Sequence, residues 1–206
     1  MTCETAWEHV ENAEAHRRRG EFSAAGDWFT AAAYEYLGDS PPGFPATTAC
    51  KGEYMFLLAG VCYRLAGTRD QCVNRCKQGI LVAEDLNARH LPVPEDEYWF
   101  ERARRGVWYE YIGDFRLVGE LAGVEEAYTE AKRIYRLGED PESGMAEQEH
   151  LYLFEFFERV VQVSAETDDE WREIRHHTPF TKWVDYKLNT LPDALDDLFT
   201  RNEWPL

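Results

Sequence analysis

Two Glu-x-x-His pairs are the strongest candidates for catalytic chemistry in this sequence: Glu147 with His150, and Glu173 with His176. In di-iron helical bundles, such pairs supply a carboxylate and an imidazole to the metals, and two further glutamates come from other helices. A helical-bundle di-metal carboxylate enzyme is therefore one interpretation. Against it, six histidines in a glutamate-rich chain produce such pairs by chance, and His176 lies at a predicted helix end close to Pro179, where a rigid ligand is not expected.

The cysteines offer a second kind of chemistry. Cys72 and Cys76 are spaced one helical turn apart, so their thiols could bind a metal or respond to oxidation. The five cysteines include no zinc-type CxxC pair, and we expect them to be reduced core residues. The sequence also lacks the phosphate-binding loops and the nucleophile-elbow motif. We therefore expect a protein without a cofactor and without catalytic activity.

Charge limits the classes of partner. The 206 residues carry 39 acidic and 22 basic side chains, for a formal net charge of −17. DNA and anionic membranes are disfavoured as partners, because both repel a net anion. The chain contains no long apolar run, and its first residues do not resemble a signal peptide, so we expect a cytoplasmic protein. Of the bases, 17 are Arg and 5 are Lys, which resembles the composition of halophilic proteins.

The elements that would position these residues are predicted to be helices. Prolines cluster in loops, and the segments between them are rich in Ala, Leu, Glu and Arg without the alternation of strands. We predict a single all-α domain with helix pairs at about 5–39, 47–88, 95–138 and 145–177, then a C-terminal cap at 179–204. The cap is expected to contain two helices, which begin near Pro179 and Pro192.

A repeat relates the first three pairs. Gly20, Gly67 and Gly113 are 47 and 46 residues apart, and each is expected to end a helix. A small residue precedes each glycine by seven positions, and a ring precedes it by four. The small residues are Ala13, Gly60 and Gly106, and the rings are His16, Tyr63 and Tyr109. Self-similarity at this period is typical of stacked helical arrays.

These units resemble the tetratricopeptide repeat, a helix-turn-helix unit. The resemblance covers residues 6–39 and 53–86, and 99–137 in part. The family unit is about 34 residues long, so the longer copies here are similar to SNAP-type arrays. The tryptophan usual in the first helix is replaced by His9, Phe56 and Arg102. The resemblance implies a right-handed superhelix of antiparallel helix pairs, whose concave face binds a peptide or helix of another protein.

Aligning the units predicts which residues line that concave groove. The set combines rings, aliphatic side chains and two arginines that could pair with acidic groups of a partner. Its members are Trp7, Val10, Arg17, Tyr54, Leu57, Arg64, Phe100 and Val107. In the competing interpretation the rings belong to the core and the arginines to a solvated edge. A third function remains open, a structural module that self-assembles, for example as a weak homodimer, through exposed rings such as Trp171, Trp183 and Trp204.

Overall fold

Helices make up nearly all of the chain that the computed structural model describes, which is residues 3–38, 46–89, 99–138, 147–161, 179–202 and 204. The prediction of an all-α protein is confirmed for these ranges, which contain no strand. The helices are α1 (Cys3–Arg18), α2 (Phe22–Gly38), α3 (Ala46–Leu65), α4 (Arg69–Arg89), α5 (Trp99–Val118), α6 (Val124–Gly138), α7 (Glu147–Val161) and α9 (Phe180–Arg201). The second half of the predicted pair at 145–177 lies outside the described residues. None of the described helices is long and apolar enough to cross a membrane.

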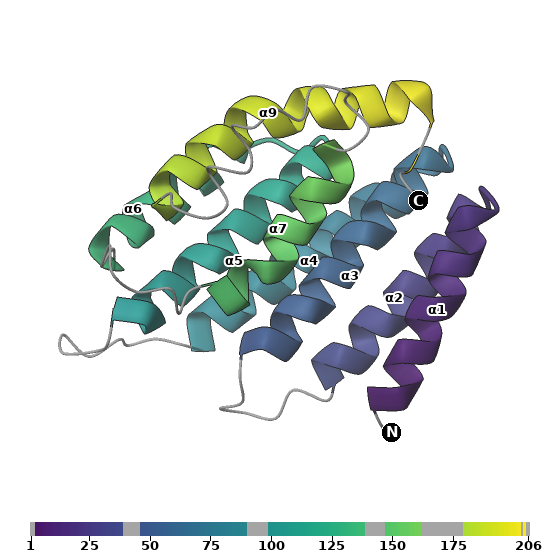
Figure 1. Ribbon diagram of the computed structural model, residues 1–206, viewed down its shortest axis with the longest axis horizontal. Helices are drawn as coiled ribbons and strands as arrows, with labels where there is room; N and C mark the ends of the chain where they lie inside the picture. Colours follow the sequence, from purple (N-terminus) through teal and green to yellow (C-terminus); the bar gives the residue numbers. More distant parts are fainter. Residues whose placement is uncertain are drawn as a thin grey trace.

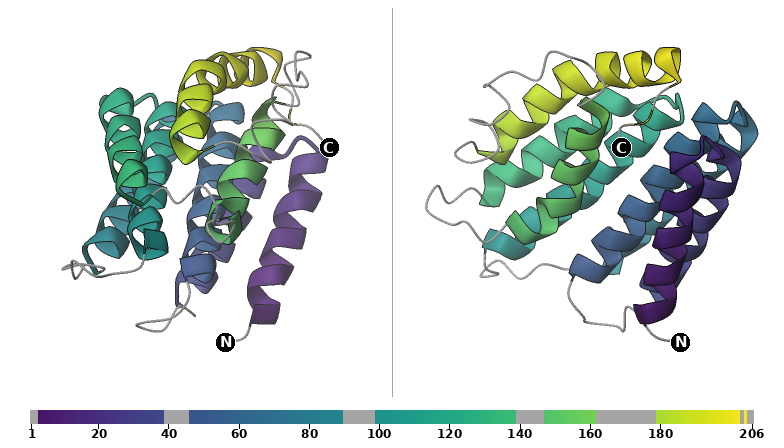
Figure 2. Two further views of the ribbon diagram at one scale, coloured as in Figure 1. Left: turned by 60° about the vertical axis from the view of Figure 1, so that its left-hand side comes forward. Right: turned by 45° about the vertical axis from the view of Figure 1, so that its right-hand side comes forward.

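The first six helices form a row in which each helix packs against the next (Figure 1). The first members of the predicted pairs are α1, α3 and α5, and their shared side of the row is here called the inner face. Helix α7 packs on α3 and α5, and α9 packs on α5, α6 and α7 (Figure 2). The C-terminal helices therefore cover the α3 and α5 parts of the inner face.

Helices α1, α3 and α5 end in the same backbone motif. After α1, the N–H of Gly20 donates to the carbonyl oxygen of Arg17 at 2.9 Å, and the next N–H donates to that of His16 at 3.0 Å. The same pair of bonds recurs at Gly67 and at Glu120. All three residues have positive φ, 71° at both glycines and 51° at Glu120. This is the Schellman motif, which satisfies the last carbonyls of a helix.

The predicted helix end at Gly113 is wrong. Gly113 lies inside α5, which continues to Val118, so the third turn residue is Glu120. A Cβ atom at Gly113 would lie 2.7 Å from the ring of Tyr128 in α6, so this glycine permits close packing rather than a turn. Helix α6 accordingly begins at Val124.

The C-terminal cap also differs from the prediction. It is one helix, α9, with Pro192 in its interior, and not two helices. An interior proline removes one backbone hydrogen bond and costs about 3 kcal/mol. Leu191, Ala194 and Leu195 around it are all buried, and this burial offsets the loss. The helix ends at Asn202, which has the left-handed conformation and donates its N–H to the Leu198 carbonyl oxygen.

Candidate functional site

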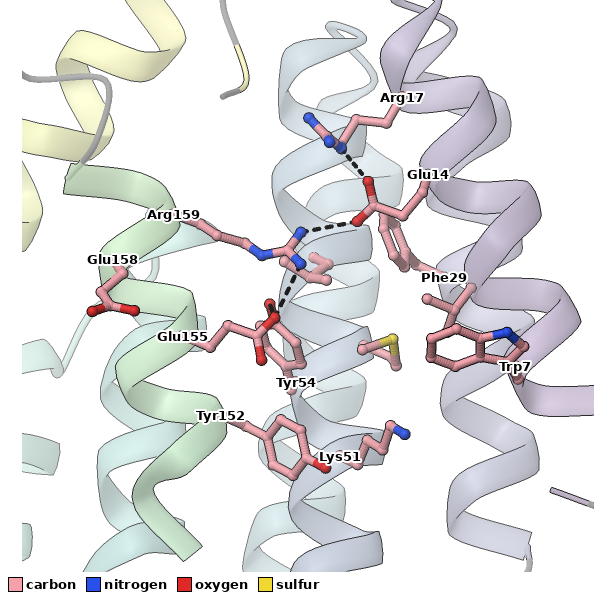
Figure 3. A pocket seen from close by; sticks show the side chains of 13 residues that line it. Trp7, Glu14, Arg17, Phe29, Lys51, Tyr54, Tyr152, Glu155, Glu158 and Arg159 are labelled. Carbon is pink, nitrogen blue, oxygen red and sulfur yellow. Dashed lines mark hydrogen bonds and ion pairs between the residues drawn. The ribbon is translucent and has the colours of Figure 1, made fainter. Parts of the chain in front are cut away.

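A cleft of about 650 Å³ opens between α1, α3 and α7 (Figure 3). It lies beside α7, where the inner face is formed by α1 and α3. Its lining comes mainly from these three helices, with one residue from α2. The lining residues are Trp7, Val10, Glu14, Arg17, Phe29, Lys51, Tyr54, Met55, Leu58, Tyr152, Glu155, Glu158 and Arg159.

The base of the cleft is apolar, and one wall carries an exposed ring. Met55 and Leu58 of α3 are buried in the core at the base of the cleft. Trp7 of α1 is 55% exposed, although the rest of its helix packs against α2. On the opposite wall Tyr152 of α7 stacks on Tyr54, with ring centroids 5.6 Å apart. The cleft thus presents aromatic surface from both walls (Figure 3).

An ion network joins the two walls at one end of the cleft. Arg159 of α7 donates to Glu14 of α1 at 2.9 Å and to Glu155 at 3.0 Å. Tyr54 of α3 donates its hydroxyl to the same Glu155 oxygen at 2.8 Å. On α1 itself, Arg17 donates to Glu14 at 2.7 Å. These bonds fix the separation of α1 and α7, so the cleft exists before any ligand binds.

The electrostatics of the network follow from its pairing. Burial alone would raise the pKa of the Glu14 carboxyl, but hydrogen bonds from Arg159 and Arg17 outweigh it and hold this pKa below its usual value. Burial raises the pKa of the Tyr54 hydroxyl well above its usual value. Glu14 is therefore charged and Tyr54 neutral near pH 7. Both cleft arginines already share a carboxylate partner.

The structure brings half of the predicted groove residues to this cleft. Four of the eight line it, namely Trp7, Val10, Arg17 and Tyr54. Leu57 and Val107 do not, because the chain itself covers them completely and they belong to the core. Phe100 lies in α5, but its side chain is outside the described part of the chain.

Arg64 is a further correction to the predicted groove. Its guanidinium donates to the carbonyl oxygen of Val118 at 3.1 Å and to the carboxylate of Glu120 at 2.8 Å. It also lies over the ring of Phe199 in α9, 3.9 Å from the centroid. Arg64 thus fastens α3 to the end of α5 and to α9.

The corrected helix ends define which inner-face positions are equivalent. Thirteen residues before the three turn residues stand Trp7, Tyr54 and Val107. Ten residues before them stand Val10, Leu57 and Glu110, and six before them stand Glu14, Val61 and Asp114. The inner face therefore carries carboxylates on α1 and α5 and apolar side chains on α3.

The two α5 carboxylates form the centre of a buried charge cluster with α9. Lys187 of α9 donates to Glu110 at 2.9 Å and to Asp114 at 2.6 Å. Trp183, one turn earlier, donates its indole N–H to Glu110 at 2.8 Å. The Tyr128 hydroxyl donates a hydrogen bond to Asp114 at 2.5 Å. All five side chains are buried, so the cluster holds α9 on the inner face and is closed to a partner.

The pKa shifts in this cluster reflect burial opposed by Lys187. For Glu110 burial would raise the pKa, but the charges of Lys187 and His150 lower it below the usual value. For Asp114 the effect of burial is larger than that of Lys187, and the pKa rises to about 6. For Lys187 burial would lower the pKa, but the two carboxylates raise it above the usual value. The lysine is therefore charged near pH 7.

The candidate metal ligands are not assembled in the part of the chain that is described. Among those residues no group of three or more His, Cys, Asp or Glu side chains could hold a metal. His150 is buried, with Nε2 2.8 Å from the Tyr135 hydroxyl and its ring stacked on Phe180. Glu173 and His176 lie outside the described residues, as does the side chain of Glu147.

The other candidate groups are core residues. Cys72 and Cys76 are both buried and not in a disulfide. Trp183 and Trp204, proposed above as exposed rings for self-assembly, are buried as well, because α9 packs on the row and Trp204 lies against the core. Trp171 is outside the described residues.

Sequence reasoning missed the contribution of α7 to the cleft. Tyr152, Glu155 and Arg159 line it, and their spacing places them on one side of that helix. This stripe was visible in the sequence, but nothing in the sequence indicated that it faces α1. The chain matches no protein-family model, no curated protein and no solved structure.

Proposed function

We propose that this protein is a non-catalytic adaptor, built of tetratricopeptide-like helix pairs, which binds a peptide or helix of another protein in the cleft between α1, α3 and α7. Trp7 carries the proposal, because a large ring that is 55% exposed beside an apolar base is typical of a binding surface. Tryptophan is also enriched among residues that dominate binding energy at interfaces.

The preformed walls support the same function. Arg159 connects α7 to α1 through Glu14, and Tyr54 and Glu155 tie α7 to α3. A cleft that is already held open loses little conformational entropy on binding. Such a site suits recognition of a segment of another protein better than it suits chemistry, because Glu14, Arg17, Glu155 and Arg159 are already paired with one another.

The repeated turns support the family resemblance. The Schellman motifs at Gly20, Gly67 and Glu120 are 47 and 53 residues apart, and each closes the first helix of a pair. The second of these spacings is longer than the 46 residues between Gly67 and Gly113 predicted, because α5 continues past Gly113 to Val118. Stacked pairs of this kind form a continuous inner face on which a partner can lie.

The test is a peptide-display selection on the purified protein. Peptides enriched on the wild type should bind Trp7→Asp at least about tenfold more weakly, which corresponds to about 1.4 kcal/mol. Leu81→Asp is the matched control, since Leu81 on α4 is 65% exposed and does not line the cleft. Circular dichroism would verify that both variants stay folded.

Two results would contradict the proposal. One is a selection that enriches no peptide on the wild type. The other is equal binding of the enriched peptides to the wild type and to Trp7→Asp, because the site would then lie elsewhere.

A further inference from the structure

The buried charge cluster of α5 and α9 brings a primary amine into contact with two carboxyl groups. The Nζ atom of Lys187 lies 2.6 Å from Oδ2 of Asp114 and 2.9 Å from Oε1 of Glu110. None of the three side chains has any exposed surface. An amine and a carboxyl group can condense to an amide, so this contact joins the two reactants of a covalent bond between α5 and α9.

The two carboxyl groups differ in their hydrogen-bond partners. Oδ1 of Asp114 is not the oxygen that Lys187 contacts, and it accepts from the Tyr128 hydroxyl at 2.5 Å. A donor at this oxygen would stabilise the negative charge that develops there when an amine attacks the carboxyl carbon. Glu110 contacts the same nitrogen and also accepts from the indole N–H of Trp183 at 2.8 Å. This arrangement places Asp114 as the electrophile and Glu110 as the base.

The protonation states agree with this division of roles. Burial raises the pKa of Asp114 to about 6, so part of the population carries a neutral carboxyl group near pH 7. For Glu110 burial would raise the pKa, but the charges of Lys187 and His150 hold it below its usual value, so Glu110 remains a carboxylate that can accept a proton. A proton transfer from Lys187 to Asp114 produces a neutral amine and a neutral acid without changing the net charge of the pair.

The surroundings of the pair favour loss of charge and keep bulk water away. The Nζ atom of Lys187 lies 5.7 Å from the ring centre of Trp183 and 5.9 Å from that of Tyr128, and both rings are buried. Two charges taken out of water carry a desolvation penalty even when they pair. Condensation would replace them by a neutral amide, and a site closed to solvent would protect this amide from hydrolysis.

We propose that Lys187 and Asp114 form an isopeptide bond that joins α9 covalently to α5. Lys187 first passes one proton to Oδ2 of Asp114, and Nζ then attacks Cγ while Glu110 accepts a second proton from the nitrogen. The Cγ–Oδ2 bond breaks, Glu110 returns its proton to Oδ2, and this oxygen leaves as one water molecule. The third proton stays on the amide nitrogen. The step needs no oxidant, reductant or further reactant, and the cluster has the same net charge before and after it.

The positions of the two residues in the chain give the bond its consequence. Lys187 and Asp114 are 73 residues apart, so the amide would close a long loop of the chain. A covalent link of this kind restricts the unfolded chain and would keep α9 on the inner face. The proposal concerns the attachment of α9, and it is independent of what binds in the cleft.

Intact-mass spectrometry of the full-length protein in urea tests the bond, because urea separates ion pairs but does not cleave amides. The wild type should weigh less than its sequence by the mass of one water molecule. Proteolysis should then release one branched peptide that contains both Lys187 and Asp114. A wild type that keeps its full sequence mass, even after prolonged incubation in the folded state, would overturn the proposal. So would a loss of water that maps to any other pair of residues.

Two variants and a control test the roles of the residues. Lys187→Arg keeps the positive charge but cannot form the amide, and it should have its full sequence mass. Glu110→Gln keeps both reactants and removes the base, so it should form the bond about a hundredfold more slowly. Lys182→Arg, on the exposed side of α9, is the matched control and should lose water as the wild type does.

Circular dichroism would verify that the variants stay folded. The mass of the wild type decides on the bond even where a variant does not fold. A folded Glu110→Gln variant that condenses as fast as the wild type would show that Glu110 is not the base.

Discussion

Glu53 is the least compensated ionisable residue among those described. It lies on α3, is fully buried, and neither carboxyl oxygen has a hydrogen-bond partner. Burial raises the pKa of this carboxyl well above its ordinary value of 4.5, so it keeps its proton where an exposed glutamate would lose it. A neutral carboxylic acid is far less costly to bury than a carboxylate.

The burial of Glu53 predicts a specific dependence of the free energy of unfolding on pH. Because the folded state holds the proton above pH 4.5 and the unfolded chain does not, the contribution of Glu53 to stability is fully present below that pH and is lost as the pH rises. In Glu53→Gln this dependence disappears. The free energy of unfolding of the variant, relative to the wild type, should therefore rise between pH 5 and pH 8, by at most about 1.4 kcal/mol per unit.

Chemical denaturation at several pH values measures this difference, and groups common to both proteins cancel. Glu8→Gln, at an exposed position of α1, is the control and should show no such trend. A difference between Glu53→Gln and the wild type that stays constant with pH would show that Glu53 is charged in the folded protein.

Among the elements, α9 depends on one buried cation. Lys187 is the group that neutralises both α5 carboxylates, and Trp183 adds a hydrogen bond to Glu110. Breaking a buried pair by removing one partner costs about 3–5 kcal/mol, because the other charges remain without compensation. The attachment of α9 is therefore vulnerable to a single substitution.

Lys187→Met should lower the free energy of unfolding by about 3–5 kcal/mol and increase hydrogen exchange in α9. The loss should be smaller at pH 5 than at pH 8, because the carboxylates can then take up protons. Lys182→Met, on the exposed side of α9, is the matched control. Adding Glu110→Gln and Asp114→Asn to Lys187→Met should recover part of the stability. A variant as stable as the control would mean that the cluster does not hold α9.

At the scale of the whole molecule, the net charge of −17 destabilises the compact chain through repulsion. Salt screens this repulsion over about 3 Å at 1 M. We predict that the melting temperature rises by about 5 °C or more between 0.1 and 2 M KCl. A variant in which exposed acids such as Glu8, Glu11 and Asp70 are replaced by their amides should melt higher at low salt and respond less to KCl. A melting temperature that does not rise with KCl would remove the proposal of a salt-adapted protein.

The sequence by itself determined the helices and much of their pairing. Periodicity, loop prolines and helix-ending glycines are local signals, so the all-α class and the turns at Gly20 and Gly67 could be read from them. It also pointed to Trp7, Val10, Arg17 and Tyr54, which line one cleft. A local signal was ambiguous at Gly113, because glycine serves both helix ends and close helix contacts.

Only the tertiary structure decided what lies over the inner face. Lys187 is 73 residues from Asp114 in the chain, and Arg159 is 145 residues from Glu14. Which helix lies over which place depends on the fit of whole surfaces and on the neutralisation of buried charge. No repeat or spacing in the sequence encodes this directly. For that reason α7 and α9 came to cover α3 and α5, whereas no helix of the described ranges lies over α1, where the cleft opens.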